Sequence, residues 1–255
     1  MTPSAPPVAA VILAAGQGKR MKNPDLAKVL HEVGGKPLIE HVVNQAIACE
    51  ADPVVAIIGH QREAVRKHLD SLGRQEIRTA VQEEQLGTGH AVIQAESALA
   101  NFEGDVLILS GDVPLTRPET LRSMLKLHRD KAAAVTVMTA ELPDPTGYGR
   151  VIRDENGRIV KIVEHKDANE SEKKVSEINS GIYIFQKKAL FDALSRVTND
   201  NAQGEYYLPD VFAIFKKEGK TMEPYLVDSF NEIRGVNTLE QLQELEAMYH
   251  EMYKS

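Results

Sequence analysis

The stretch VAAVILAAGQGKR, residues 8 to 20, decides how the rest of the chain is interpreted. Its apolar, β-branched first half is typical of a strand buried on both faces of a parallel sheet. Small residues and two glycines, Gly16 and Gly18, follow, and then come Lys19 and Arg20. Small residues let backbone N–H groups approach an anion closely, and basic side chains balance its charge. The stretch therefore predicts a phosphate-binding loop at the end of a first strand.

Two common phosphate-binding motifs do not fit this loop. A Walker A loop needs glycine where Leu13 stands and Ser or Thr where Arg20 stands. A dinucleotide fingerprint needs its third glycine where Met21 stands. A nucleotidyltransferase loop, Gly-x-Gly-x-Arg followed by a later Lys, fits the residues. A glycine-rich turn with solvated charges is the alternative.

Strand-like and helical patterns alternate through the first half of the chain. Residues 54–59 and 105–110 repeat the apolar pattern of the first strand. Helical patterns occupy residues 36–50, 62–72, 89–100 and 118–130. This β-α-β-α order predicts an α/β fold with a doubly wound, mostly parallel, Rossmann-like sheet.

The second half changes in character. Residues 149–165 predict two short strands joined by a turn at Asn156 and Gly157. The chain closes with an amphipathic helical pattern, with Thr238 at its cap position. No linker separates two independent cores, so we expect one α/β domain with a β-rich lobe over its sheet.

The composition and charge exclude several classes of function. The 255 residues carry a formal net charge of −7 and no long basic run, which argues against a nucleic-acid partner. The first apolar run is too short to span a membrane, and no charged signal-peptide start precedes it. The single cysteine, Cys49, fits a buried, inert thiol in a reducing compartment. We therefore expect a cytoplasmic protein that binds neither nucleic acid nor a membrane.

Two polar positions outside the loop suggest specific chemistry. Asp112 follows a buried strand at its carboxyl end, where open α/β sheets bind ligands. An Asp there suits Mg²⁺ between phosphates, and capping of the next helix is the alternative. Gln82 carries both a hydrogen-bond donor and an acceptor, as a uracil edge requires. His90, with no proton-transfer partner in the sequence pattern, is interpreted as a packing residue.

Nine motifs, in order along the chain, resemble those of the sugar-phosphate nucleotidyltransferases. They are LAAGQGKRM, KVLHEVGGKPLIEHV, QEEQLGTGHA, GDVPL, DPTGYGR, VEHKDA, EINSGIY, NAQGEYYL and GVN. Within that family the chain is similar to the uridylyltransferase domain of bifunctional bacterial enzymes that also carry an acetyltransferase domain. The resemblance covers about residues 9 to 245 and implies a glycosyltransferase-A-like fold.

The resemblance also implies how the domain is divided. It implies a nucleotidyltransferase domain over residues 1–237 and a C-terminal helix over 238–255. Within the domain, the nucleotide-binding part would occupy about 8–140 and the sugar-binding lobe about 141–230.

The resemblance assigns roles to individual positions. It implies catalytic roles for Arg20, Lys28 and Asp112, with Asp112 and Asn237 as the ligands of Mg²⁺. The implied nucleotide-binding residues are Leu13, Ala14, Ala15, Gly16, Gly18, Gln82, Gly87, Thr88, Ser110 and Gly111. The implied sugar-binding residues are Gly149, Glu164, Asn179 and Tyr207. A structural role is the alternative for each sugar-binding position, and for Tyr207 sugar contact and core packing are equally favoured.

The implied reaction is Mg²⁺-dependent transfer of the uridylyl group of UTP to N-acetylglucosamine-1-phosphate, forming UDP-N-acetylglucosamine and pyrophosphate. Transfer to another sugar-1-phosphate, use of another nucleoside triphosphate, and non-catalytic binding of a nucleotide sugar are the alternatives. The sequence departs from the family pattern near Pro24, where one residue is added, and at Ala27, where Pro is usual before Lys28. Ser110 and Pro209 also depart from it, which bears on sugar selectivity.

The acetyltransferase half of the bifunctional enzymes has no counterpart in these residues. We therefore expect no acetyl-CoA binding and a monomer. A dimer through the apolar face of the C-terminal helix is the alternative, with Leu242 and Tyr253 on that face.

Overall fold

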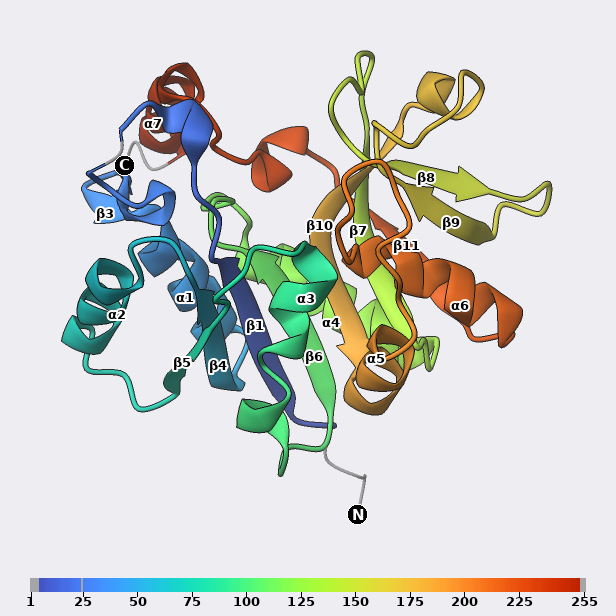
Figure 1. Ribbon diagram of the computed structural model, residues 1–255, viewed down its shortest axis with the longest axis horizontal. Helices are drawn as coiled ribbons and strands as arrows, with labels where there is room; N and C mark the ends of the chain where they lie inside the picture. Colours follow the sequence, from blue (N-terminus) through green and yellow to red (C-terminus); the bar gives the residue numbers. More distant parts are fainter. Residues whose placement is uncertain (1–4, 24, 253–255) are drawn as a thin grey trace.

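A computed structural model describes residues 5–23 and 25–252 of the chain. Within those residues, nine strands form one sheet (Figure 1). Seven follow the order β11-β7-β10-β6-β1-β4-β5, β8 pairs with β10, and β9 pairs with β8. Strands β2 and β3 form a separate small hairpin. The strands are β1 (Val8–Ala14), β2 (Glu32–Val33), β3 (Lys36–Pro37), β4 (Ala51–Ile58), β5 (Ile77–Val81), β6 (Asp105–Ser110), β7 (Val135–Glu141), β8 (Arg150–Arg153), β9 (Ile159–Val163), β10 (Glu177–Gln186) and β11 (Met222–Leu226).

Most pairs in the seven-strand path are parallel. Strand β10 is antiparallel to both of its neighbours, β6 and β7, and the other pairs in that path are parallel. The predicted mostly parallel α/β sheet is therefore confirmed. The helices are α1 (Leu38–Ala48), α2 (Arg62–Ser71), α3 (Thr88–Ile93), α4 (Pro118–Asp130), α5 (Lys187–Leu194), α6 (Val211–Lys217) and α7 (Leu239–Met252). None of them, over the residues described, has the length and apolar character needed to cross a membrane.

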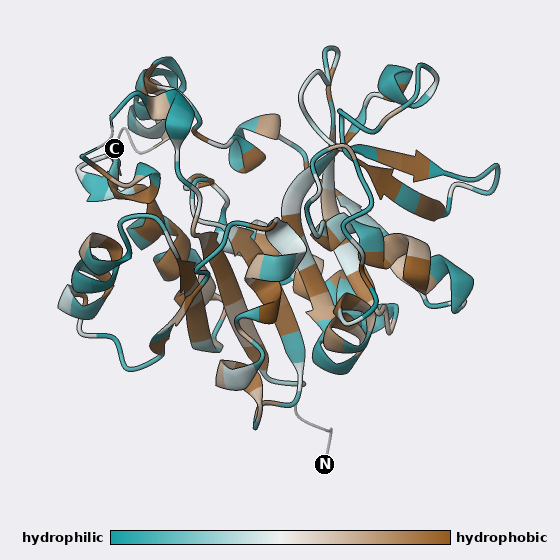
Figure 2. Ribbon diagram, viewed as in Figure 1, coloured by the Kyte–Doolittle hydropathy of each residue, from teal (hydrophilic) through white to brown (hydrophobic). Residues whose placement is uncertain are grey.

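Helices cover both faces of the sheet, as a doubly wound fold requires. Along β1, Ala10 and Ile12 pack with side chains of α1, α2 and α4. The alternate residues Ala9 and Val11 pack with side chains of α3, α5 and α6. Since successive side chains of a strand point to opposite faces, one apolar run supplies two cores. Figure 2 shows the result as hydrophobic central strands between helices with hydrophilic outer sides.

Three local predictions can be compared with the structure. The turn at Asn156 and Gly157 joins β8 to β9, with Gly157 at a φ of 75°, so that prediction is confirmed. Thr238 caps α7 by accepting a hydrogen bond from the N–H of Gln241, as predicted. The single helix expected over residues 89–100 is wrong, because α3 ends at Ile93.

The break after α3 has a physical reason. The N–H groups of residues 94, 95 and 96 donate to carbonyls three residues earlier, which tightens the chain into 3₁₀-type turns. Ala95 and Leu99 are nevertheless buried in the same apolar layer as Val92. The apolar residues therefore do have helical spacing, but they lie on α3, on the turn after it and on a short 3₁₀ helix (Ser97–Leu99).

The apolar face of α7 is covered by its own chain. Leu245 is fully buried in a cluster with Met21, Leu115 and others, and Leu242 packs against that cluster. A Cβ atom on Gly34, whose φ is 59°, would overlap the Tyr249 ring, so the helix lies directly on the β2–β3 turn. This packing favours the monomer among the two expected states, although the oligomeric state stays a prediction. Tyr253 lies outside the described residues.

The packing of α7 predicts a large difference between two leucines of the same helix. Leu245→Ala should lower the free energy of unfolding by about 2 to 5 kcal/mol, because it opens a cavity at a fully buried site. Leu239, which is 41% exposed, is the matched control, and Leu239→Ala should cost less than about 0.5 kcal/mol. Urea unfolding followed by circular dichroism measures both, and equal losses would contradict this docking of α7.

Candidate active site

The predicted phosphate loop lies at the carboxyl edge of the sheet, where β1 and β6 end side by side. Leu13 of β1 is paired with Ser110 of β6, so the loops that follow the two strands leave the sheet together. A cavity of about 290 Å³ opens between them. It is lined by Leu13, Ala14, Ala15, Gly16, Lys28, Val29, Gln82, Gln85, Gly87, Thr88, Ala91, Ser110, Asp112 and Glu205. Eight of the ten predicted nucleotide-binding residues therefore line one cavity.

Four charged and polar side chains meet at the edge of this cavity. The Lys28 ammonium forms an ion pair with the Asp112 carboxylate and donates a hydrogen bond to Oδ1 of Asn237 at 2.9 Å. Arg20 donates to the same Asn237 oxygen at 2.8 Å. These residues come from three distant parts of the chain, yet they form one hydrogen-bonded network. They are the residues for which the resemblance implied catalytic and metal-binding roles.

The loop after β1 is shaped so that Arg20 and Lys28 reach the network. Gly18 has a φ of 60°, and a Cβ atom there would lie 2.7 Å from Cβ of Lys28, so glycine is required. Met21 closes a 3₁₀ turn onto Gly18 and is buried, which leaves Arg20 on the outer side. Pro24 lies outside the described residues. The departures around it do not keep Lys28 away from Asp112.

The oxygen ligands of the network suit a hard cation. Asp112 and Asn237 direct their side-chain oxygens at the same ammonium group, so the two oxygens already converge on one positive charge. Mg²⁺ takes one or two protein oxygens and completes its shell with phosphate and water oxygens. The described residues include no group of three or more His, Cys, Asp or Glu side chains that could hold a metal ion. A metal bound here would therefore depend on its substrates for further ligands.

A buried carboxylate fixes the segment that carries Asn237. Glu232 is 3% exposed and accepts hydrogen bonds from Oγ1 of Thr120 at 2.6 Å and from the backbone N–H of Arg117 at 3.3 Å. The Glu232 carboxylate also pairs with the Arg117 guanidinium and raises its pKa. Since Val236 then donates to the backbone carbonyl of Asp112 at 3.0 Å, the two expected metal ligands are held in register. No local sequence pattern marks Glu232, because its partners lie more than 110 positions away.

Gln82 has its carboxamide held by the protein. The side chain is 3% exposed, and its Nε2 donates to the carbonyl of Gly87 at 3.1 Å. The same nitrogen lies 3.1 Å from Nδ1 of His90. Nε2 of His90 lies 3.2 Å from Nε2 of Gln94, which also donates to the carbonyl of His90 at 3.0 Å. The interpretation of His90 as a packing residue is therefore incomplete, because both ring nitrogens have polar partners.

A second cavity, of about 210 Å³, adjoins the first. Three residues line both cavities: Leu13, Thr88 and Ser110. The second cavity is otherwise lined by Gly147, Tyr148, Gly149, Glu164, Asn179, Ser180, Gly181, Tyr183, Leu208 and Pro209. Three of the four predicted sugar-binding residues therefore lie together in a cavity next to the first one.

The predicted sugar-binding residues of this second cavity are in direct contact. Asn179 donates its backbone N–H to the carbonyl of Gly149 at 2.9 Å, and a Cβ atom on Gly149 would lie 3.4 Å from Oε1 of Glu164. Burial raises the pKa of Glu164, and the nearby Asp167 and Asp210 raise it further. The wall is thus rich in acceptor oxygens, which suits the hydroxyl and amide donors of a sugar.

Tyr207 is not among the residues that line either cavity. It is 6% exposed, its hydroxyl accepts a hydrogen bond from Gln203 at 2.7 Å, and burial raises its pKa to about 12. Of its two interpretations, the structure agrees with packing. Gly18 and Gly111 also stand outside the two linings, and Gly111 donates its N–H to the carbonyl of Leu13 at 2.9 Å. These two glycines affect the site through the backbone conformation of the loops after β1 and β6, not by lining a cavity.

Two motifs that are distant in sequence, residues 87–89 and 206–208, are joined by hydrogen bonds at the boundary between the cavities. Gly89 donates to the carbonyl of Tyr206 at 2.7 Å, and Leu208 donates to Oγ1 of Thr88 at 3.0 Å. A Cβ atom on Gly87, whose φ is 107°, would lie 2.6 Å from the Tyr206 carbonyl oxygen. Glycine is therefore required at residue 87 if the two segments are to approach so closely.

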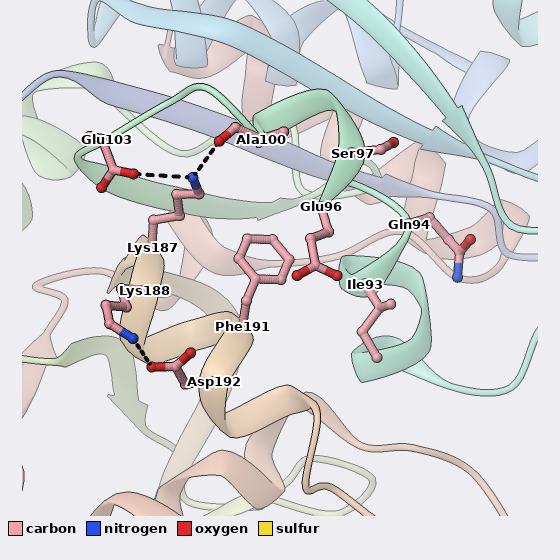
Figure 3. A pocket seen from close by; sticks show the side chains of 10 residues that line it. All are labelled: Ile93, Gln94, Glu96, Ser97, Ala100, Glu103, Lys187, Lys188, Phe191 and Asp192. Carbon is pink, nitrogen blue, oxygen red and sulfur yellow. Dashed lines mark hydrogen bonds and ion pairs between the residues drawn. The ribbon is translucent and has the colours of Figure 1, made fainter.

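A larger cavity, of about 600 Å³, lies at the other edge of the sheet, near the start of β6 (Figure 3). Residues of α3, of the following turns and of α5 line it, and its two lysines are paired. Lys187 donates to the carbonyl of Ala100 at 3.2 Å, and Lys188 pairs with Asp192. Ligands of open α/β sheets bind at the carboxyl ends of the strands, so the smaller cavities are the better candidates despite their size.

Comparison with known proteins bears on what these cavities hold. The family model described as nucleotidyl transferase matches residues 9–230. The chain belongs to the nucleotidyl transferase family. This family assignment agrees with the resemblance found in the nine motifs, all but the last of which begin within the matched residues.

The relatives of this nucleotidyl transferase include longer proteins. The bifunctional protein GlmU of Listeria innocua is 53% identical over 228 residues, which are 89% of this chain and 49% of that protein. The protein of the same name from Bacillus licheniformis is 52% identical over the same shares. The chain thus spans about half the length of the curated relatives it matches.

Solved structures confirm the predicted type of fold. A UDP-glucose pyrophosphorylase complexed with UDP-glucose superimposes with a TM-score of 0.78 at 18% identity, covering 97% of this chain and 99% of that one. A putative glucose-1-phosphate thymidylyltransferase from Bacillus anthracis gives a TM-score of 0.76 at 22% identity, covering 94% of each chain. At these identities the likeness concerns the fold alone.

The acidic surroundings of the second cavity predict a pH-dependent cost to stability. Burial raises the pKa of Asp210 from 3.8 to about 6, and Asp167 contributes. The folded protein therefore binds the Asp210 proton more tightly than the unfolded chain does. The contribution of this proton to stability is fully present below about pH 4 and is lost as the pH rises through about 6.

Asp210→Asn should remove that loss. Between pH 4 and pH 7 the variant should gain about 1 to 2 kcal/mol in free energy of unfolding relative to the wild type, less than the full shift implies because the side chain is partly open to solvent. Urea unfolding at the two pH values measures the difference. Asp200→Asn, at an exposed position, is the control and should show no such gain. A pH-independent difference for Asp210→Asn would contradict the burial argument.

Proposed function

We propose that the protein transfers the uridylyl group of UTP to N-acetylglucosamine-1-phosphate, forming UDP-N-acetylglucosamine and pyrophosphate. The observation that carries the proposal is the meeting of Arg20, Lys28, Asp112 and Asn237 at the edge of the first of two adjoining cavities. One cavity is bordered by the phosphate loop and the other by acceptor-rich residues. Membership of the nucleotidyl transferase family supports the type of reaction, and the motif resemblance supports the choice of substrates.

The reaction needs charge neutralisation more than it needs a protein nucleophile. An oxygen of the sugar-1-phosphate attacks the α-phosphorus of UTP, and the bond from that phosphorus to the pyrophosphate oxygen breaks. The attacking phosphate monoester is already a dianion near neutral pH, so no side chain has to remove a proton from it. What the protein has to supply is proximity, in-line orientation and positive charge.

The four residues can divide this work among them. Arg20, on the outer side of the loop, would hold the departing pyrophosphate through bidentate hydrogen bonds. Lys28 would leave its ion pair with Asp112 to bridge the α-phosphate and the sugar phosphate. Asp112 and Asn237 would then hold Mg²⁺, which when bound supplies charge neutralisation at the phosphate oxygens.

The two cavities would then receive different parts of the substrates. Gln82 and Gly87, in the first cavity, would face the uracil edge, and the small residues after β1 would lie against the ribose and phosphates. In the second cavity, Glu164 would accept hydrogen bonds from sugar hydroxyl groups. Asn179 would exchange hydrogen bonds with the hydroxyl and N-acetyl groups. Ser110 lines both cavities, so it would contact the group that joins the two ligands.

The catalytic proposal predicts a strong effect at Asp112. With UTP and N-acetylglucosamine-1-phosphate, the purified protein should release pyrophosphate only when Mg²⁺ is present. Asp112→Ala should lower kcat by about a hundredfold or more, because a group that holds charge at the reacting phosphates is lost. Asp130→Ala, at the exposed end of α4, is the control and should leave kcat unchanged. Near-normal turnover by Asp112→Ala, or in excess chelator, would refute the assignment.

The sugar assignment predicts selectivity for the N-acetyl group. The protein should prefer N-acetylglucosamine-1-phosphate to glucose-1-phosphate in kcat/KM, because a site built to hydrogen-bond an amide leaves its own polar atoms unpaired when the amide is missing. Asn179→Ala should reduce this preference while leaving the KM for UTP nearly unchanged. Equal kcat/KM for the two sugars in the wild type would overturn the assignment. Ser110 and Pro209, which line the second cavity, would then be the positions to exchange.

A further inference from the structure

His90 connects the candidate base-binding glutamine to the helix that follows it. It lies in the first turn of α3, and its Nδ1 is 3.1 Å from Nε2 of Gln82. Its other nitrogen, Nε2, is 3.2 Å from Nε2 of Gln94, one helical turn later, and that amide nitrogen also donates to the His90 carbonyl at 3.0 Å. The ring of Tyr206 lies against the imidazole at a centroid distance of 6.5 Å. The imidazole therefore has a polar neighbour at each ring nitrogen and an aromatic ring beside it.

The neighbours of Gln82 determine which way its carboxamide is oriented. The carbonyl oxygen of Gly87 can only accept a hydrogen bond, so the Gln82 atom 3.1 Å away must be the NH₂ group. The second hydrogen of that NH₂ group is directed at Nδ1 of His90, which must accept it. Nε2 of Gln94 is also turned toward the ring, but Gln94 is only partly buried and can turn away, whereas Gln82 is buried. The Gln82 contact therefore fixes Nδ1 as the accepting nitrogen. Both donors of Gln82 are used inside the protein, and its oxygen is left for the cavity that Gln82 lines.

We infer that His90 is a positioning residue that sets the base preference of the site by fixing the orientation of the Gln82 carboxamide. An outward carbonyl oxygen accepts a hydrogen bond from the N3–H of uracil. The N3 atom of cytosine carries a lone pair instead, so the same oxygen repels it. The arrangement thus selects a pyrimidine that has a hydrogen on N3. This inference rests on the proposed function, since it takes the first cavity to be the base-binding site.

Loss of His90 would remove one of the two anchors of Gln82. The carboxamide would then be held only by the Gly87 carbonyl and would rotate more freely, which would expose its NH₂ group to the base for part of the time. A single net hydrogen bond decides the ratio of the two orientations, so the expected change in selectivity is about five- to tenfold. Gln82 itself supplies the contact, so its own loss should have the larger effect.

A double-mutant cycle tests this role with two readouts. The wild type, His90→Ala, Gln82→Ala and the double variant are compared for kcat/KM with UTP and with CTP, and for the Kd of each nucleotide by calorimetry. His90→Ala should lower the UTP-to-CTP ratio about five- to tenfold in both readouts, with kcat at saturating substrates changed less than twofold. In the Gln82→Ala background, the same substitution should change the ratio less than twofold, because nothing remains to be positioned.

A conservative variant separates positioning from packing. The Oδ1 of Asn can occupy nearly the place of the Nδ1 of His and can accept the same hydrogen bond, so His90→Asn should recover most of the UTP preference. If His90→Ala has its full effect in the Gln82→Ala background, or if His90→Asn is as poor as His90→Ala, the inference is overturned. If Gln82→Ala itself leaves UTP binding and turnover unchanged, the proposed base site is wrong. If Gln82→Ala weakens UTP while His90→Ala does not, only the role of His90 is wrong.

Discussion

The ion pair between Lys28 and Asp112 is the interaction on which the candidate site depends. It joins the loop after β1 to the loop after β6, and the parallel pairing of those two strands brings both ends to one edge of the sheet. The pair is largely shielded, with 15% and 19% of the two side chains exposed, so neither charge can lose its partner cheaply. Oδ1 of Asn237 accepts hydrogen bonds from both Lys28 and Arg20, so two cationic side chains share one acceptor. The charged side chains of the site are thus paired with one another, and anionic substrates can take the place of these partners.

The surrounding structure serves to keep this network in place. The buried Glu232 ties the segment before Asn237 to the start of α4, and α7 covers Met21, which closes the turn that carries Arg20. Neither group lines a cavity, yet each restrains a member of the network. Toward the second cavity, the backbone hydrogen bond between Gly89 and Tyr206 restrains the segment of chain that separates the two cavities.

The sequence was sufficient for three adjacent strands of the sheet, β6, β1 and β4, and insufficient for most of what surrounds them. Continuous apolar runs at 54–59 and 105–110 identified buried parallel strands, because such strands must be apolar on both faces. Strand β11 was not identified, since it contains Pro224 and has no fully buried residue, as edge strands allow. Asp112 and Asn237 are 125 positions apart, so only the family resemblance could bring them together. The hydrogen bonds of His90 and Glu232 depend on tertiary packing and leave no local pattern.

The three side chains shared by the two cavities have a thermodynamic consequence. Leu13, Thr88 and Ser110 present surface to both compartments, so any adjustment that one ligand imposes on them is felt by the other. Linkage requires such an effect to be reciprocal: the factor by which the nucleotide changes the affinity for the sugar phosphate equals the factor by which the sugar phosphate changes the affinity for the nucleotide. The order in which the ligands bind would then depend on association rates, while any cooperativity between them would arise from the three shared side chains.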